Sequence, residues 1–462
     1  MNSAHRNPQE IRAQILDLVR EYHEAAHQPA PFEPGKTRVC YSGRVYDSAE
    51  MAVLIDCALD FWLTLGPCGH RFERRMREFF GASDFVLVNS GSSANLLMVS
   101  TACAPELWRR LGETGKKPLE AGDEVITPAV TFPTTLTPLV QNRLIPVFVD
   151  CELDTCNLDP ALLEAAIGPR TRAILAPHTL GVPCDMAAIM EIANRRGLWV
   201  LEDGCDALGA TFDGRLVGTF GEMSSLSFYP AHHMTMGEGG GVAVNGPGMG
   251  AIARSIRDWG RDCWCDPGKS NTCGKRFDWQ LGELPEGYDH KYVYSSLGYN
   301  LKPTDLQAAI GLAQADKVAG FIESRRRNYR RLYQGLLPLE DYLLLPRIDR
   351  RANPSPFGFV VTVREGIERR ALVRHLEEAN IETRLVFGGN ILRQPGFLNI
   401  ERRVPGSLAV SDEIMRRTFF VGVYPGLTEP MLDYMVEAFH SFFRPAAAVR
   451  SGKGQHGEST VR

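Results

Sequence analysis

The stretch DFVLVNSGSSANLLMVSTA, residues 84–102, decides the expected fold. Its first part, DFVLV, is a short apolar run rich in β-branched residues, which is typical of a buried strand. The second part, SSANLLMVSTA, predicts the helix that follows the strand. The turn between them consists of glycine and serine, which is typical of the strand-to-helix turns of α/β proteins.

The same alternation continues to about residue 204. Helices are predicted for LDPALLEAAI and for MAAIMEIANRRG, which ends at Gly197 as a helix C-cap would. Strands are predicted for DEVITP, IPVFVD, TRAILAPH and LWVLEDG. We therefore expect an α/β fold with a large, mostly parallel sheet covered by helices on both faces. Ligands of such sheets bind at the carboxyl ends of the strands.

The remaining patterns divide the chain into further parts. A long helical pattern leads from the large sheet to FGFVVTVR, ALVRHLEEANI and TRLVF, which together predict a second, smaller α/β unit. The predicted division is a helical arm (1–34), a large domain (35–303), a connecting helix (304–334), a small C-terminal domain (335–445) and a disordered tail (446–462).

Composition excludes several classes of protein. The chain has 462 residues, 44% of them apolar, and a net charge of -4, so nothing indicates binding to nucleic acid or to a membrane. No run is long enough to span a bilayer, and the polar N-terminus does not resemble a signal peptide. The 11 cysteines are an odd number in a chain without an export signal. We therefore expect a cytoplasmic protein with reduced thiols, some of them bound to metal.

Three features at predicted strand ends indicate a binding site. Gly91, Ser92 and Ser93 lie where a strand meets a helix, and such a junction binds phosphate when it is not simply an N-cap. Phe132 follows another strand and either stacks on a planar ligand or belongs to the core. Asp203 ends an apolar strand. A partly buried carboxylate at that position either pairs with a cation, such as a protonated pyridine nitrogen, or caps the following helix.

The stretch SLSFYPAHHMTMGEGGG, residues 225–241, places His232 and His233 on a loop flanked by glycines. No lysine occurs between Lys117 and Lys269. Histidine moves protons readily near neutral pH, but it cannot form the covalent imine that lysine forms with an aldehyde cofactor.

In order and spacing, these motifs resemble the DegT/DnrJ/EryC/StrS sugar aminotransferase family of the fold type I, aspartate aminotransferase-like vitamin B6 enzymes. The resemblance runs from about residue 35 to 445 and includes GHRFERRMREFFGASDFVLVNSGSSAN and GYNLKPTDLQAA. It implies that Asp203 pairs with the cofactor's pyridine nitrogen and that Phe132 stacks on its ring. It implies a phosphate site made by the glycine-serine loop, by Ser227, and by Asn300 of the partner subunit, and hence a homodimer.

The family's cofactor-binding lysine is replaced by His232 in this chain. The resemblance and the replacement together imply pyridoxamine phosphate, held without a covalent bond, and His232 as the acid/base catalyst. We expect His233 to support the loop rather than act directly. His178, at another strand end, is a weaker candidate for contact with cofactor or substrate.

The segment RDWGRDCWCDPGKSNTCGKRF, residues 257–277, carries three cysteines, and a fourth lies two residues after the aspartate at the strand end. Four thiolates suit structural zinc or a [2Fe–2S] cluster, although the C-x-C spacing fits zinc poorly. Unpaired cysteines are the remaining interpretation. The proposed ligands are Cys205, Cys263, Cys265 and Cys273.

This cysteine set, with histidine at the lysine position, resembles the branch of nucleotide-diphospho-4-keto-6-deoxyhexose 3-dehydrases. The branch implies pyridoxamine phosphate together with a [2Fe–2S] cluster, a CDP- or dTDP-linked 4-keto-6-deoxysugar as substrate, and loss of its C3 hydroxyl. It also implies a reductase, or a ferredoxin or flavodoxin, as electron donor. Two alternatives remain open at this point: a related dehydrase without a cluster, and a catalytically silent, aminotransferase-like sugar-binding protein.

Overall fold

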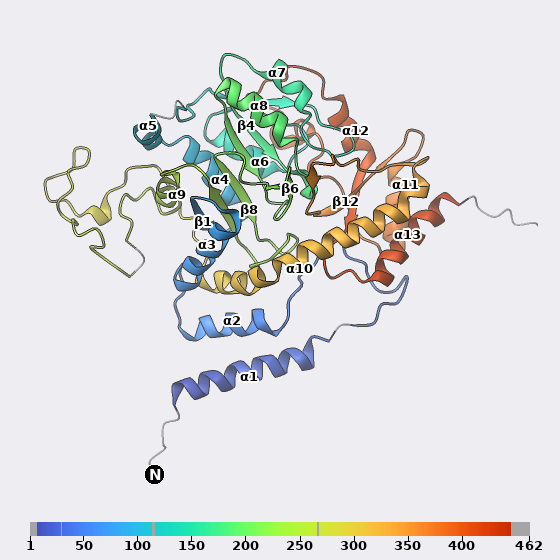
Figure 1. The fold of residues 1–462 in the computed structure, drawn as a ribbon, viewed down its shortest axis with the longest axis horizontal. Coiled ribbons are helices and arrows are strands. Elements are labelled where there is room, and N and C mark those ends of the chain that lie inside the picture. Colours follow the sequence, from blue (N-terminus) through green and yellow to red (C-terminus); the bar gives the residue numbers. More distant parts are fainter. Residues whose placement is uncertain (1–6, 29, 113–115, 266–267, 445–462) are drawn as a thin grey trace, which may run out of the picture.

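A computed structural model of the chain describes residues 7–28, 30–112, 116–265 and 268–444. The predicted tail, and the first six residues of the predicted arm, lie outside the described residues. Figure 1 shows a large α/β body, a smaller unit at one side of it, and a long helix that runs beneath both.

The central sheet has seven strands, in the order β1 (Asp84–Val88), β9 (Gly240–Val244), β8 (Met223–Ser227), β5 (Trp199–Asp203), β4 (Thr171–Pro177), β2 (Glu124–Pro128) and β3 (Ile145–Val149). Strands β8, β5, β4, β2 and β3 are parallel, whereas β9 is antiparallel to both of its neighbours. The fold class predicted from the sequence, an α/β protein with a large and mostly parallel sheet, is confirmed.

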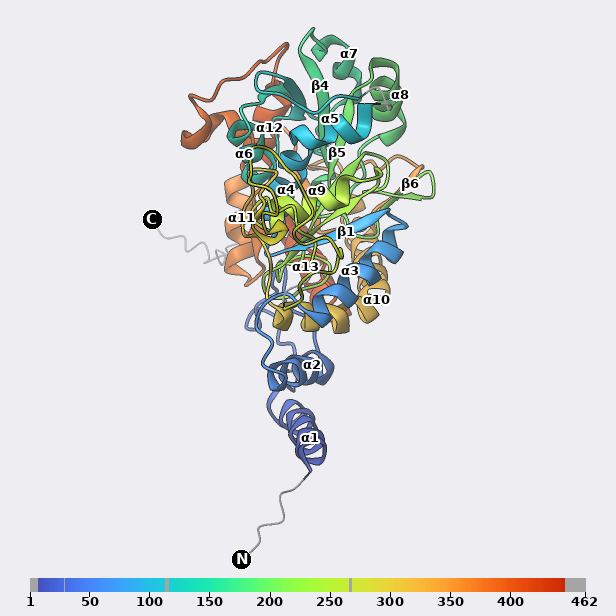
Figure 2. The same ribbon diagram turned by 90° about the vertical axis from the view of Figure 1, so that its left-hand side faces the viewer.

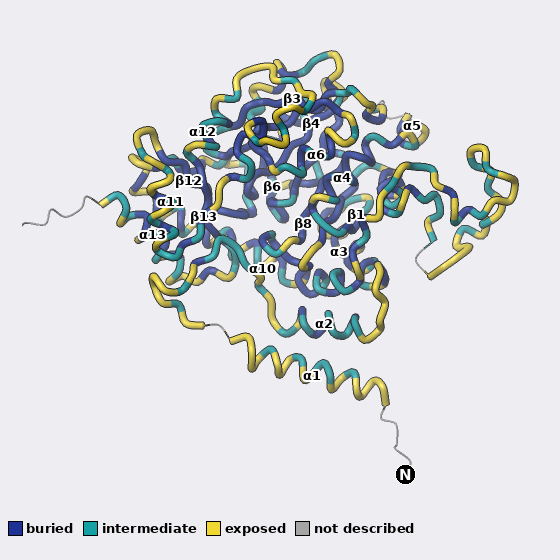
Figure 3. The backbone as a smooth tube through the Cα atoms, turned by 180° about the vertical axis from the view of Figure 1, so that it is seen from behind, coloured by how far each residue is buried: buried dark blue, intermediate teal, exposed yellow. Residues whose placement is uncertain are grey.

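Helices cover both faces of this sheet, which explains why most of its strands are buried at every residue. The helices are α3 (Pro67–Phe80), α4 (Gly91–Ala102), α5 (Pro105–Leu111), α6 (Pro133–Gln141), α7 (Leu163–Ala166), α8 (Met186–Arg196) and α9 (Met249–Arg257). Helix α2 (Ser48–Leu59) packs instead against α1 (Pro8–Ala26) and α10 (Asp305–Leu336). Helices α4, α6 and α9 share one buried cluster with the sheet, and α7 and α8 share the cluster on the other face. The buried strands are dark blue in the middle of Figure 3.

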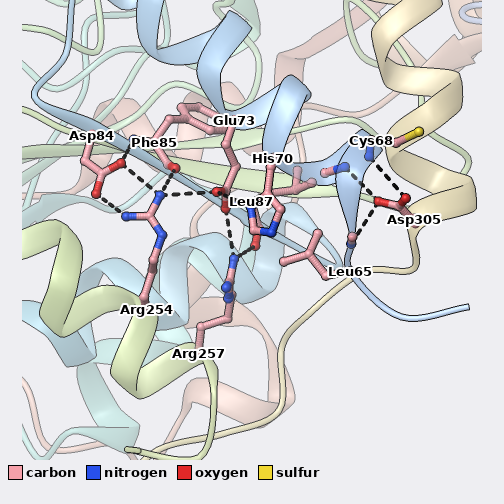
Figure 4. Close-up of polar contacts among 12 residues, drawn as sticks. Leu65, Cys68, His70, Glu73, Asp84, Phe85, Leu87, Arg254, Arg257 and Asp305 are labelled. Atoms are coloured by element: carbon pink, nitrogen blue, oxygen red, sulfur yellow. Dashed lines mark hydrogen bonds and ion pairs between the residues drawn. The ribbon is translucent and has the colours of Figure 1, made fainter. Parts of the chain in front are cut away.

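A buried carboxylate joins α3, β1 and α9 (Figure 4). Glu73 accepts hydrogen bonds from the backbone N–H of Leu87 (2.9 Å), from Arg257 Nη1 (2.9 Å) and from Arg254 Nη2 (3.2 Å). Arg254 also pairs with Asp84 at the start of β1. These charges are satisfied by one another, as buried charges must be, and they fix the edge of the sheet next to the β1–α4 turn.

The smaller unit contains a four-stranded antiparallel sheet, in the order β10 (Leu343–Leu344), β12 (Gly358–Val363), β14 (Thr418–Gly422) and β13 (Thr383–Arg384). Its helices are α11 (Arg369–Glu378), α12 (Ala409–Arg417) and α13 (Glu429–Phe443). A three-stranded sheet, β11 (Ala352–Asn353), β6 (Thr211–Phe212) and β7 (Arg215–Leu216), joins this part to the large body. The 32-residue helix α10 (Asp305–Leu336) contributes to the cores of both parts.

The N-terminal helix α1 (Pro8–Ala26) has no buried residue and lies against α2, outside the main body (Figures 1 and 2). Beyond it, the chain returns to the small unit: Val39 donates to Asn380 O (2.8 Å), and its carbonyl accepts from Glu382 N (2.9 Å). The large domain predicted from the sequence (35–303) includes Val39. Its apolar side chain instead joins the small unit's core because an extended segment can pair with the exposed backbone there.

The connection between α9 and α10 contains only a short 3₁₀ turn, η4 (His290–Tyr292), among its described residues. It projects from the body as a long excursion (Figure 1), and much of it is exposed (Figure 3). Among the described helices, none has the length and apolar character needed to cross a membrane.

Candidate active site

A cavity of about 490 Å³ opens at the carboxyl ends of β4, β5 and β8, beside the β1–α4 turn. This is the edge of the sheet at which the sequence analysis expected a ligand. The small unit supplies the opposite wall with Arg384, Leu385, Phe387 and Phe420. The volume is sufficient for a cofactor and part of a substrate.

Asp203 faces the cavity from the last position of β5 and is 7% exposed. Its Oδ2 accepts hydrogen bonds from Asn95 Nδ2 (2.9 Å) and Thr135 Oγ1 (2.6 Å). Its Oδ1 accepts from Cys205 N and Ser225 Oγ, both at 3.1 Å. No lysine or arginine pairs with this carboxylate among the described residues, so four neutral donors hold a buried negative charge that a cationic ligand would neutralise.

The β1–α4 turn forms the corner of the cavity that was expected to bind phosphate. Gly91 and Ser92 line the cavity, as does Ser227 at the end of β8. Ser93 does not line it, and its N–H instead donates to the Oγ of Ser90, the N-cap of α4 (3.0 Å). A Cβ at Gly91 would lie 2.5 Å from the Cβ of Ser227, so only glycine permits this close approach. The start of helix α4 is thereby presented to the cavity, where its N–H groups and partial positive charge favour an anion.

His232 enters the cavity on the loop between β8 and β9. Its Nδ1 lies 3.4 Å from Asp206 Oδ1, and its ring packs against Phe357 with ring centres 5.1 Å apart. Burial and the nearby Arg325 guanidinium lower the pKa of His232 to about 4. The imidazole is therefore neutral at pH 7, which is the state in which it can accept a proton.

A buried arginine on α10 holds the loop that carries His232. Arg325 is 1% exposed and donates to the carbonyls of His232 (2.9 Å) and Ala231 (3.3 Å). Its other terminal nitrogen donates to the carbonyls of Pro356 and Phe357, both at 3.3 Å, at the entry to the small unit. One side chain therefore fixes the histidine loop against the opposite wall of the cavity.

The other two histidines of interest are held by hydrogen bonds within the fold. His178 is buried; its Nδ1 accepts from Cys184 N (3.1 Å), and its Nε2 lies 3.1 Å from the buried Glu202 carboxylate. His178 can therefore offer the cavity a ring face but no unused nitrogen. His233 Nε2 lies 2.9 Å from the carbonyl of Ser355 and away from the cavity.

Phe132 and Asn300 are the remaining residues of the predicted cofactor site. Phe132 lines the cavity with half of its surface exposed, and its ring contacts Phe387 edge-on. Asn300 is exposed and does not line the cavity of its own chain. A role in the cofactor site therefore requires a second subunit.

The four cysteines proposed as ligands lie in two places. Cys205 lines the cavity, and a Cβ on Gly91 would lie 3.2 Å from its Sγ. On the projecting connection, Cys265 Sγ accepts from Thr272 N (3.3 Å) and Cys273 Sγ accepts from Lys275 N (3.4 Å). The described residues do not bring these four thiols together within ligand distance of one centre.

The residues of the cavity fit a phosphorylated pyridine cofactor. A buried carboxylate without a cationic partner faces one end, and a corner that a Cβ would fill faces the start of a helix. The four thiols are too far apart in this structure to bind one cluster. Two of them accept N–H hydrogen bonds, which is the kind of contact that iron–sulfur ligands receive.

Several site residues were not singled out from the sequence. Asn95, Thr135 and Ser225 orient Asp203. Of these, Asn95 has a signal in the sequence, because it lies one helical turn after Gly91 and therefore on the same face of the helix. Arg325 and Arg384 carry no local signal, since they come from distant parts of the chain.

Comparison with known proteins agrees with this geometry. Residues 45–440 match the model of the DegT/DnrJ/EryC1/StrS aminotransferase family. The chain is 50% identical over 435 residues to the dTDP-4-dehydro-2,6-dideoxy-D-glucose 3-dehydratase of Saccharopolyspora spinosa, covering 94% of this chain and 92% of the relative. It is 49% identical over 435 residues to the lipopolysaccharide biosynthesis protein RfbH of Salmonella typhimurium, covering 94% and 98%.

Among solved structures, the chain resembles E. coli GDP-4-keto-6-deoxy-D-mannose-3-dehydratase with bound hydrated PLP. The TM-score is 0.77 at 28% identity, and the match covers 87% of this chain and 99% of that one. The similarity therefore extends over both parts of the fold and over both walls of the cavity.

Proposed function

Because this chain belongs to the DegT/DnrJ/EryC1/StrS aminotransferase family, we propose from its site that it is a nucleotide-sugar 3-dehydrase. It removes the C3 hydroxyl of a nucleotide-diphosphate-linked 4-keto-6-deoxyhexose during deoxysugar biosynthesis. The observation that carries this proposal is His232: a neutral histidine, and not a lysine, faces Asp203 across a cavity shaped for a vitamin B6 cofactor. The named 3-dehydratases among the relatives support the substrate class.

Pyridoxamine phosphate, when bound, would supply an amine that condenses with the 4-keto group and a ring that withdraws electrons from the adjoining carbon. Asp203 would hold the ring nitrogen in its protonated form, and Phe132 would stack on the ring. Gly91, Ser92 and Ser227 would hold the phosphate, and Ser93 would support them through its bond to Ser90, the N-cap of α4. Asn300 of a second subunit would complete that site, so we also propose a homodimer.

His232 is the proposed base that takes a proton from the carbon bearing the amine. Its neutral state at pH 7 suits this role, and the Arg325 contacts keep its backbone in place. The protonated imidazole can then return the proton as the C3 hydroxyl leaves as water. Asp206 Oδ1 lies next to His232 Nδ1, but burial and the neighbouring Asp203 raise the pKa of Asp206 to about 8, so a mostly neutral carboxyl group, and not a carboxylate, lies beside the ring at pH 7.

Replacement of the C3 hydroxyl by hydrogen consumes two electrons and two protons and releases one water. The chain therefore needs an electron donor, which we propose to be a reductase, a ferredoxin or a flavodoxin. We propose that Cys205, Cys263, Cys265 and Cys273 would hold a [2Fe–2S] cluster, which would supply one-electron transfer when bound. Its support is the donor set and the N–H groups that already point at two of the sulfurs.

The experiment that tests the proposed function is product analysis. The protein is incubated anaerobically with pyridoxamine phosphate, a CDP- or dTDP-linked 4-keto-6-deoxyhexose and a one-electron reducing system. Mass spectrometry is expected to detect a 3-deoxy-4-keto sugar with one oxygen fewer than the substrate. A 4-amino sugar that keeps the C3 oxygen would indicate an aminotransferase instead, and unchanged substrate would indicate a silent sugar-binding protein.

Turnover of the two nucleotide sugars also identifies the nucleotide, because only one of them is expected to support full turnover. We retain the cytoplasmic location as a prediction from the sequence. A visible spectrum of anaerobically purified protein, with iron and sulfide analysis, tests the cluster separately from the dehydration.

A further inference from the structure

Three potential metal ligands meet at a junction of three helices, away from the cavity described above. Cys57 lies in the last turn of α2, Cys68 in the first turn of α3, and Asp305 at the first position of α10. The two Sγ atoms and one carboxylate oxygen all lie within 4.8 Å of one another. Among the described residues, this is the one group of three or more such side chains that lies close enough to share an ion.

The carboxylate of Asp305 is held in place by the first turn of α3 (Figure 4). Its Oδ1 accepts from Gly66 N (2.9 Å) and Gly69 N (2.7 Å), and its Oδ2 accepts from Cys68 N (3.1 Å). Each carboxylate oxygen offers two lone pairs, so Oδ2 keeps one unused by these bonds. Asp305 is 2% exposed, and its orientation is therefore fixed before any ligand arrives.

We propose that Cys57, Cys68 and Asp305 bind a zinc ion. Zinc takes thiolate and carboxylate ligands in tetrahedral sites, in which neighbouring ligand atoms are about 3.5–3.8 Å apart. The observed group needs only small side-chain rotations to reach this spacing. Binding releases both thiol protons and involves no change of oxidation state.

The surroundings suit a metal with one open coordination position. All three ligands line a second cavity, of about 1050 Å³, which gives the ion and a water molecule access to the site. Arg71 Nη2 donates to Cys68 Sγ at 3.3 Å, as an outer contact that stabilises a thiolate. The helices α3 and α10 both start here, so their partial positive charges offset part of the negative charge of the ligands.

The third ligand distinguishes this interpretation from a disulfide. A disulfide between Cys57 and Cys68 would use the two thiols alone, and the carboxylate oxygen within 4.8 Å of both sulfurs would take no part in it. A divalent cation uses all three groups and neutralises most of their charge. Asp305 also lies five residues after Asn300, so a bound ion would fix the start of α10, next to the segment proposed to reach the second subunit.

Zinc analysis of the full-length protein tests the site independently of the proposed reaction. The reduced chain is loaded with zinc, desalted and analysed for metal and protein. Cys57→Ser and Cys68→Ser are each expected to lose about one zinc per chain relative to the parent. Cys103→Ser, a thiol at the end of α4, is the matched control and is expected to lose none.

A triple variant distinguishes zinc bound at this site from zinc bound by the three cysteines of the connection between α9 and α10. The triple variant Cys263→Ser/Cys265→Ser/Cys273→Ser is expected to keep about one zinc and to gain thermal stability on adding zinc. Cobalt added to that variant is expected to give the charge-transfer absorbance of thiolate ligands. This test keeps Cys57 and Cys68 unchanged, so it does not depend on how well a variant at these two positions folds. Absence of that absorbance would overturn the proposal.

Two other results would also overturn it. One is equal zinc content in the parent and in the folded Cys57→Ser and Cys68→Ser variants. The other is a chain whose mass falls by two hydrogens under mild oxidant in the presence of excess zinc, with the loss mapped to Cys57 and Cys68, because thiolates bound to zinc would be protected from forming that disulfide.

Discussion

The cavity at the strand ends and the cysteine connection between α9 and α10 differ in how completely the fold builds them. In the cavity, Asp203 is held by four donors, His178 by two partners, and the His232 loop by a buried arginine. In the connection, one 3₁₀ turn is the only helix or strand among the described residues, local contacts such as those of His290 with Asp262 and Trp279 hold the rest, and its cysteines are partly exposed.

The cavity is therefore formed before its cofactor binds, whereas the cysteines of the connection need a bound cluster to bring them together. Hydrogen bonds within the fold orient Asp203 and His178 without a cofactor, so the cofactor joins a prepared site. Four buried polar atoms of the cavity have no hydrogen-bond partner within the described chain: Asn95 Oδ1, Thr131 Oγ1, Thr179 Oγ1 and His232 Nδ1. Loops of Gly, Pro, Asp and Asn have few buried apolar contacts of their own. A cluster would therefore contribute much of the order of the connection, as bound metals do in small metal-binding domains.

The largest expected effect comes from breaking the chemistry of the prepared site. His232→Asn removes the proposed base but keeps a polar side chain of similar size. We expect C3 dehydration to fall by about 10²–10⁴-fold, the usual contribution of a positioned base. Equilibrium dialysis should show unchanged binding of pyridoxamine phosphate. Normal turnover by this variant would contradict the role of His232.

The next effect concerns the stability of the same site. Arg325→Met keeps an apolar stem but leaves four buried carbonyls without their donor, so we expect a loss of about 3 kcal/mol or more in the free energy of unfolding. Arg330→Met, on the same helix with 61% of its side chain exposed, is the control and should change stability by about 0.5 kcal/mol or less. Urea titrations measure both. Equal effects would mean that the loop is not held by Arg325.

A third prediction concerns protonation within the cavity. Burial and Arg325 lower the pKa of His232 to about 4, against a usual value of 6.5. The unfolded chain therefore binds a proton that the folded chain refuses, so this group makes folding less favourable as the pH falls from 6.5 towards 4. NMR titration of the protein without cofactor, assigned with His232→Asn, should find a neutral ring throughout pH 5–8. A midpoint near 6.5 would show that the ring is not buried as described.

The smallest effect is expected in the connection. Cys273→Ser alters a partly exposed loop, so the free energy of unfolding of the cluster-free protein should change by about 0.5 kcal/mol or less. Cofactor binding should also be unchanged. The variant should nevertheless lose iron and visible absorbance after anaerobic reconstitution with iron and sulfide. Full retention of that absorbance would exclude Cys273 as a ligand.

Much of this arrangement followed from local sequence pattern, and the reason is geometric. Parallel strands end at one edge, so Asp203 and Ser227, which end neighbouring strands, were predicted to meet without any knowledge of the fold's details. The sequence alone predicted that His232 replaces the family's lysine, because the surrounding motif at residues 225–241 identifies the position of that lysine. Asp203's donors are less visible, because Asn95 and Thr135 reach it from two separate helices.

Contacts between distant parts of the chain were beyond such patterns. Arg325 lies in the middle of a regular helix, and nothing in its local sequence marks it as the residue that holds a loop 93 residues away. Val39 pairs with the small unit although its sequence position is next to the large one. Spacing alone also gave no indication that Cys57 and Cys68 meet Asp305 across three helices.

The central claim is that His232 stands where a covalent anchor would be, so the cofactor is held without a bond to the chain. The most direct test is to load the protein with pyridoxal phosphate, treat it with borohydride and measure the intact mass, with His232→Lys as the positive control. We predict no added mass for the natural sequence and one reduced adduct at position 232 in the variant. A stoichiometric adduct mapped to any residue of the natural cavity would contradict the claim.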